Sequence, residues 1–254
     1  MVRQRRMVVW SAVLIFQTQV LTSCGPPPQA RLEADEHYLV SQQYLGDGRY
    51  QPAEQEIRKA LDLVPHEARY FELLALIYQA QGRLNLADDA YRAALQQPDA
   101  PPSVMVNYST VLLRRDRYDE AIELARRALQ NPGYDKPDIA YYNIGYAYLK
   151  KGEVRQAVDS FHAALEYQPS LPEAHHNLGL AYTRLGERAQ AARSFREAIR
   201  YRPSYVEAHA ELGKVLLEEG HRDEARAAFE QVVALAPDSE LAVAARRQLQ
   251  RLNP

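Results

Sequence analysis

The chain has 254 residues, of which 46% are hydrophobic and 25% charged, and this balance excludes both a disordered and a collagen-like protein. The formal net charge is −2 and no long run of one sign occurs, so we expect no nucleic-acid partner. A single cysteine, Cys24, excludes an internal disulfide framework and any multi-cysteine metal site.

The N-terminal residues have the pattern of an export signal. Arg3, Arg5 and Arg6 precede the segment Met7–Phe16, which is apolar apart from one serine. A basic start followed by a short apolar stretch is typical of a secretory signal peptide. A permanent transmembrane helix is the weaker alternative, because spanning a bilayer takes about 20 apolar residues. We therefore predict a signal peptide over residues 1–23.

The apolar stretch ends in Leu21-Thr22-Ser23-Cys24-Gly25, which resembles the lipobox of bacterial lipoproteins. The resemblance implies cleavage before Cys24, acylation of its thiol and amine, and a mature chain that is anchored to the membrane rather than spanning it. Several acyl chains hold a protein far more firmly than one. Gly25 in place of an aspartate implies the periplasmic face of the outer membrane. The alternative is that Cys24 is an incidental thiol behind a soluble secretory signal.

Three prolines, Pro26 to Pro28, follow Gly25. We predict that residues 24–33 form a lipidated, Pro-rich tether, in which Gly25–Gln29 is a stiff, non-helical spacer.

The remaining sequence is one motif repeated. Six prolines, each of which closes a stretch rich in Ala, Leu, Arg and Glu, follow one another at intervals of 33, 34, 37, 34 and 34 residues: Pro65, Pro98, Pro132, Pro169, Pro203 and Pro237. A fixed period of this length determines the architecture of the whole chain.

In register, the fifth unit resembles the tetratricopeptide repeat at Leu178, Gly179, Tyr182, Ala191 and Phe195. We assign units to 34–67, 68–101, 102–135, 138–171, 172–205 and 206–239. The resemblance implies an all-α fold, a right-handed superhelical α-solenoid of six helix pairs over 34–239. Residues 240–254 carry an apolar stripe beside several arginines, which predicts a capping helix.

The repeat also predicts how the helices pack. Small residues such as Gly145 and Gly179 should lie opposite large ones such as Phe161 and Phe195, as a close-packed interior requires. Turns between the paired helices are expected at Gly152, Gly186 and Gly220.

The register assigns structural roles to residues that could otherwise indicate chemistry. His37, His175 and His209 occupy equivalent repeat positions, where we expect packing rather than metal binding. Arg114-Arg115 and Lys150-Lys151 should be solvated helix ends matched to the helix dipole. The chain has no nucleotide-binding motif and no combination of nucleophile and base, so we expect no enzymatic activity, cofactor, metal or small-molecule substrate.

In tetratricopeptide proteins the first helix of each unit lines a concave groove that binds partners. The groove positions here are unusually apolar and aromatic: Tyr38, Leu45, Leu76, Val106, Leu113, Tyr142, Tyr146, Leu149 and Leu180. No unit has the Lys or Arg and the Asn with which some family members clamp a C-terminal carboxylate. Aromatic anchors dominate protein interfaces, so we expect a segment of another protein in the groove. Alternatively, much of the stripe packs against neighbouring repeats.

One irregularity in the repeat spacing indicates which group of tetratricopeptide proteins this chain resembles. Two extra residues separate the third and fourth units, and a tyrosine-rich helix with Tyr141, Tyr142, Tyr146 and Tyr148 follows them. With the expected anchor and six repeats, this resembles the PilF/PilW-type pilotins of type IV pilus assembly. The resemblance implies that the groove holds a segment of a secretin and helps its subunits reach the outer membrane and assemble. The alternative is a scaffold lipoprotein for another envelope assembly, such as polysaccharide export or cell-wall synthesis.

Overall fold

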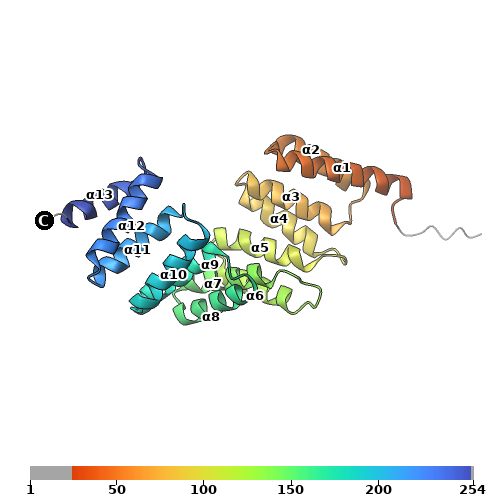
Figure 1. The fold of residues 1–254 in the computed structure, drawn as a ribbon. Coiled ribbons are helices and arrows are strands. Elements are labelled where there is room, and N and C mark those ends of the chain that lie inside the picture. Colours follow the sequence, from red (N-terminus) through yellow and green to blue (C-terminus); the bar gives the residue numbers. More distant parts are fainter. Residues whose placement is uncertain (1–24, 253–254) are drawn as a thin grey trace, which may run out of the picture.

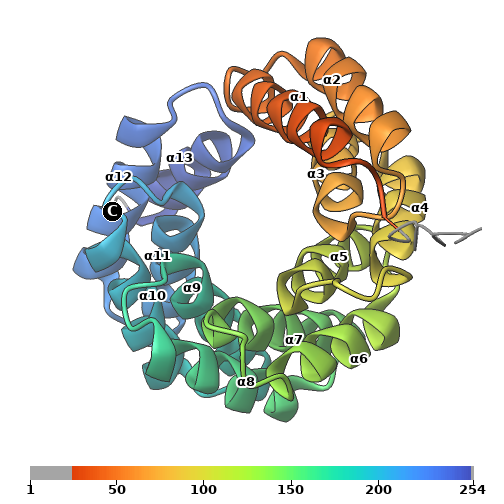
Figure 2. The same cartoon turned by 90° about the vertical axis from the view of Figure 1, so that its right-hand side faces the viewer.

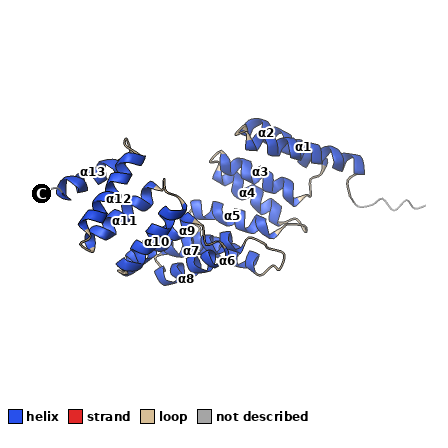
Figure 3. Ribbon diagram, viewed as in Figure 1, coloured by secondary structure: helices blue, strands red, loops and turns tan. Residues whose placement is uncertain are grey.

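The computed structural model describes residues 25–252, and within this range the chain forms thirteen α-helices and no strand (Figures 1 and 3). The predicted signal peptide and Cys24 lie outside the described residues. The helices are α1 (Pro28–Gly46), α2 (Tyr50–Leu63), α3 (Ala68–Ala80), α4 (Leu84–Leu95), α5 (Pro102–Arg114), α6 (Tyr118–Leu129), α7 (Pro137–Lys151), α8 (Val154–Tyr167), α9 (Pro172–Leu185), α10 (Arg188–Tyr201), α11 (Val206–Glu218), α12 (Arg222–Leu235) and α13 (Glu240–Leu252).

The helices form six consecutive hairpins that stack into an α-solenoid, which confirms the predicted fold class. Viewed along the stack, the chain curves around an open centre (Figure 2). The odd-numbered helices of the hairpins face this centre, and the even-numbered ones form the outer layer (Figure 2). No helix in the described range is both long and apolar enough to cross a membrane.

Local sequence explains where the helices begin and end. Helices α5, α7 and α9 each have a proline in the first turn, where the missing N–H leaves no hydrogen bond unmade. Gly152 and Gly186 cap the carboxyl ends of α7 and α9, and their φ angles of 82° and 77° are in the left-handed region that glycine adopts readily. The third hairpin differs, because the non-glycine residue Asp116 takes this conformation there, with φ 56°.

Close contacts between glycine and phenylalanine join the paired helices of the last three repeats. Gly145 lies on the ring of Phe161, and a Cβ placed at Gly145 would be 2.8 Å from a ring carbon. The equivalent distance is 2.6 Å between Gly179 and Phe195. The predicted pairing of small and large side chains is therefore present, and the absent Cβ lets the two helices approach closely.

The two ends of the solenoid differ in how well the sequence predicts them. The non-helical spacer expected over Gly25–Gln29 is wrong for Pro28 and Gln29, because α1 begins at Pro28. A proline in the first turn starts a helix as readily as it ends one. At the other end, α13 buries Ala242, Ala245 and Leu252 against the last repeat.

Candidate functional site

The odd-numbered helices that face the open centre form the concave wall of the solenoid. This wall has two neighbouring hollows, both on the inner helices of the first four repeats. The smaller hollow lies between α5 and α7 and has a volume of about 250 Å³. Its lining consists of Thr110, Leu113, Arg114, Tyr142, Asn143 and Tyr146. Leucine and tyrosine side chains supply most of its apolar surface, and Thr110, Asn143 and Arg114 add a hydroxyl, an amide and a guanidinium group.

The larger hollow, of about 680 Å³, lies at the carboxyl ends of α1, α3 and α5. Leu45 and Leu76 form its apolar part, and Gln79, Ala80, Gln81, Gly82 and Arg114 complete the lining. Arg114 lines both hollows, so the two adjoin at this residue. We call the surface formed by the two linings the inner groove.

The residues expected in the groove divide into two sets. Leu45, Leu76, Leu113, Tyr142 and Tyr146 line the inner groove. Of the others, Tyr38 and Leu180 are half-buried on α1 and α9, outside the two linings.

Val106 and Leu149 are only 2% and 3% exposed. Both side chains belong to the hydrophobic core of the solenoid. The packing alternative therefore describes Val106 and Leu149, and neither side chain lines the inner groove. Leu113 is also buried, although its side chain still reaches the smaller hollow.

Asparagine side chains in and beside the groove link the inner helices to one another. Nδ2 of Asn143 donates to the Ser109 hydroxyl at 2.8 Å and to the Thr110 hydroxyl at 3.1 Å. Nδ2 of Asn177 donates to the Tyr142 hydroxyl at 3.1 Å. Each bond links equivalent helices of adjacent repeats, so the wall that displays Tyr142 is pre-formed, which lowers the entropic cost of binding a partner.

Tyr142 is the central aromatic residue of this wall. Its ring lies 6.3 Å from that of Tyr146 and 6.0 Å from that of Phe161, measured between centroids. Burial, with smaller effects of nearby Tyr205 and Glu173, raises the pKa of Tyr142 above its ordinary value. The phenol is therefore neutral at physiological pH and offers an apolar face with one fixed hydroxyl, the form that aromatic interface anchors take.

Cations mark the carboxyl ends of α5, α7 and α9. Nη1 of Arg114 donates to the backbone oxygen of Gln79 at 3.3 Å, and Nη1 of Arg184 donates to that of Leu149 at 2.5 Å. Lys150 places its Nζ 5.2 Å from the centroid of the Tyr146 ring. These contacts fix the positive groups beside the groove. The two carbonyl contacts could not be predicted from the sequence pattern, because each joins residues 35 positions apart.

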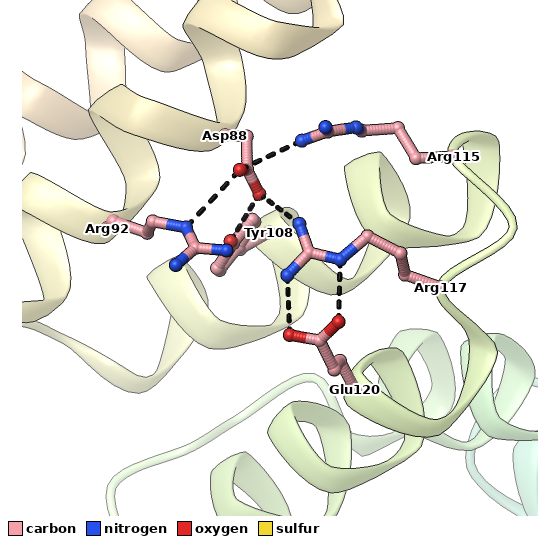
Figure 4. A network of polar contacts seen from close by, with 6 residues as sticks. All are labelled: Asp88, Arg92, Tyr108, Arg115, Arg117 and Glu120. Atoms are coloured by element: carbon pink, nitrogen blue, oxygen red, sulfur yellow. Dashed lines mark hydrogen bonds and ion pairs between the residues drawn. The ribbon is translucent and has the colours of Figure 1, made fainter.

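On the outer side, Asp88 lies at the centre of a charged cluster that joins the second and third repeats (Figure 4). Arg92, Arg115 and Arg117 approach its carboxylate at 3.2, 2.8 and 2.7 Å, and the hydroxyl of Tyr108 donates to it. Burial raises the pKa of Asp88, but the hydrogen bonds from Tyr108 and Arg115 and the charges of the other arginines outweigh it and lower the pKa.

Two of the basic residues expected to be plain solvated helix ends have structural partners instead. Arg115 pairs with Asp88, and Lys151 pairs with Asp119 at 2.6 Å, in each case a carboxylate of the preceding hairpin. The expectation is therefore wrong for Arg115 and Lys151, because repeat stacking brings distant carboxylates to these ends.

The histidines have the structural contacts that their repeat position predicts. His175 and His209 place Nε2 2.8 and 2.9 Å from the backbone oxygens of Pro169 and Pro203, in the loops before their helices. His37 places Nδ1 2.6 Å from a carboxylate oxygen of Glu56. In the described part of the chain, no three His, Cys, Asp or Glu side chains gather in a way that could hold a metal ion.

Comparison with known proteins gives similar sequences and similar structures. The type IV pilus assembly protein PilF of Pseudomonas aeruginosa is 30% identical over 145 residues, which cover 57% of this chain and 58% of that protein. The chain thus aligns with less than two thirds of this curated relative.

Two solved structures share the fold closely. PilW, described as a widely conserved type IV pilus biogenesis factor, superposes with a TM-score of 0.77 at 23% identity, covering 87% of this chain and 98% of PilW. The structure of Pseudomonas aeruginosa PilF gives a TM-score of 0.75 at 22% identity, covering 88% of this chain and 97% of that one. The expected resemblance to PilF and PilW is confirmed.

The family itself is shown by sequence models. The tetratricopeptide repeat model matches residues 41–104, 73–136 and 176–240, more than half of the chain, and a second model, described as TPR repeat, matches residues 145–186. Their matches fall on the stacked hairpins described above. The chain therefore belongs to the tetratricopeptide repeat family, whose members mediate interactions between proteins.

Proposed function

We propose that this chain is an outer-membrane lipoprotein that binds a secretin segment in the inner groove and helps secretin subunits localise and assemble for type IV pilus biogenesis. The observation that carries the proposal is the 30% identity to PilF, a type IV pilus assembly protein. The inner groove supports it, because an apolar and aromatic wall on rigid helices suits a segment of another protein.

The anchor is the second part of the proposal. Cys24, just before the described residues, carries the lipid and holds the solenoid at the periplasmic face of the outer membrane, with residues 1–23 removed as the signal peptide. Only three residues separate Cys24 from Pro28, where α1 begins. The first repeat then lies close to the membrane, at most about 15 Å of extended chain from the anchor.

The experiment starts from a strain that lacks the gene and measures the amount of assembled secretin in its outer membrane. The full chain should restore secretin rings. Cys24→Ser should leave the protein in the soluble periplasmic fraction and restore few rings. Normal rings in the strain without the gene would overturn the function, and outer-membrane fractionation of the Cys24→Ser protein would overturn the anchor.

A further inference from the structure

The linings of the inner groove differ in charge from the clefts on the outer layer. Three outer clefts lie between successive repeats, and their linings include Glu120, Asp159 and Glu224 respectively. In the described chain, neither hollow of the inner groove has an aspartate or glutamate in its lining. The single charged side chain of the groove is Arg114, which both hollows share.

The charge of Arg114 is not neutralised within the described chain. No carboxylate of residues 25–252 lies within ion-pair distance of its guanidinium, whereas its neighbours Arg115 and Arg117 both pair with Asp88. Its contact with the Gln79 carbonyl uses Nη1 and orients the planar group, and the other donors are left for a partner.

Two carboxylates close to the groove, Glu173 and Glu72, have other partners. Glu173, which acts on the pKa of Tyr142, pairs with Arg202. Glu72 accepts a hydrogen bond from Nδ2 of Asn107 at 2.8 Å. Neither carboxylate belongs to the lining of the inner groove, so Arg114 has no acidic side chain beside it there, and Lys150 and Arg184 add positive charge at the same ends of α7 and α9.

We propose that Arg114 sets the specificity of the inner groove for a peptide segment that carries a carboxylate close to an apolar side chain. The apolar side chain fills the hollow between Leu113, Tyr142 and Tyr146. The carboxylate, from an aspartate or glutamate, meets the guanidinium of Arg114 at the junction of the two hollows. A guanidinium fixed by a carbonyl is well placed for paired hydrogen bonds to a carboxylate. The inference rests on the proposed function only in taking the inner groove as the partner site.

The test uses the full chain, purified in detergent and immobilised, and a random peptide library displayed on phage. Wild-type protein should select peptides in which Asp or Glu lies near a Phe, Leu or Ile. Synthetic copies of these peptides should bind Arg114→Gln about tenfold more weakly, the loss expected for one charged hydrogen-bonded contact. Arg114→Lys should recover part of the affinity.

Arg127→Gln is the matched control, since Arg127 is an exposed arginine that lines an outer cleft. It should bind the selected peptides as the wild-type chain does. Selection of no peptides, of peptides without acidic residues, or of peptides that bind Arg114→Gln with unchanged affinity would overturn the inference. Helical circular dichroism of each variant separates loss of binding from loss of folding.

The two proposals fail separately. Acidic peptides that bind through Arg114, in a protein whose deletion leaves secretin rings intact, would keep this inference and end the proposed function. Loss of rings on deletion, together with peptides whose affinity does not depend on Arg114, would keep the proposed function and end this inference.

Discussion

Gly179 of α9 faces the ring of Phe195 of α10 so closely that a Cβ on the glycine would lie 2.6 Å from Cε1. Phe195 is fully buried, so its ring has no solvent-facing space into which to move. We predict that Gly179→Ala lowers the free energy of unfolding by about 1–3 kcal/mol, the usual cost of overpacking a core. Urea denaturation followed by circular dichroism measures the change.

Two variants check that the ring is the cause. Gly46→Ala should cost nothing, because Gly46 ends α1 with no atom within 4 Å of the added Cβ. Phe195→Leu on the Gly179→Ala background should cost less than it does in the wild type, since the shorter side chain accommodates the methyl group. Additive effects of the two substitutions would contradict this account.

Asp116 occupies a turn position that glycine fills in the other repeats. Its φ of 56° is left-handed, and its carboxylate accepts a hydrogen bond from the exposed Tyr118 hydroxyl. Left-handed backbone is unfavourable for residues with a Cβ, least so for Asp and Asn. We predict that Asp116→Gly raises the free energy of unfolding by roughly 0.5–1 kcal/mol, measured by urea denaturation. The reverse change Gly152→Asp should lower it by a similar amount, and a stabilising effect there would count against the explanation.

The cluster around Asp88 predicts a pH effect of known sign. Because the pKa of Asp88 in the folded chain is below its ordinary value of 3.8, its ion pairs stabilise the fold fully above about pH 4. That stabilisation is lost as the pH falls through the lowered pKa. Asp88→Asn should cost about 2 kcal/mol at neutral pH, since it leaves partly buried arginines without their carboxylate.

The measurement is the free energy of unfolding of wild type and Asp88→Asn between pH 7 and about pH 2. The difference between them should be constant near neutrality and shrink in acid. Asp99→Asn, in the exposed loop after α4, serves as control and should differ little from wild type at any pH. A difference that grows in acid would contradict the assignment.

The sequence predicts the solenoid well, because small and large side chains recur at a fixed spacing along the chain. Gly213 and Phe229 form the same contact as Gly179 and Phe195 one repeat later, so the packing follows from the repeat spacing. The turn at Asp116 was not predicted, since an aspartate there gives no glycine signal. The helical start at Pro28 was missed for a related reason, because a proline is compatible with both a spacer and a first turn.

The groove was predictable in position but not in depth. Repeat positions place Val106 and Tyr142 on equivalent sites of α5 and α7, yet the first is buried and the second lines the smaller hollow. The size of the side chain at one position differs between repeats, and the two extra residues occur only before α7. A repeat register predicts neither difference. The role of Arg114 was equally hidden, since it depends on which carboxylates reach the neighbouring arginines.

The most direct test of the account is recovery of a secretin with the full chain from detergent-solubilised envelopes. Wild-type protein should recover the secretin, and Tyr142→Ala with Tyr146→Ala should recover several-fold less while remaining folded, because the two rings form the wall of the smaller hollow. Tyr167→Ala, a change at an exposed tyrosine of the outer helix α8, is the matched control. Recovery of a polysaccharide-export or cell-wall synthesis protein in place of a secretin, or equal recovery by the double variant, would contradict the account.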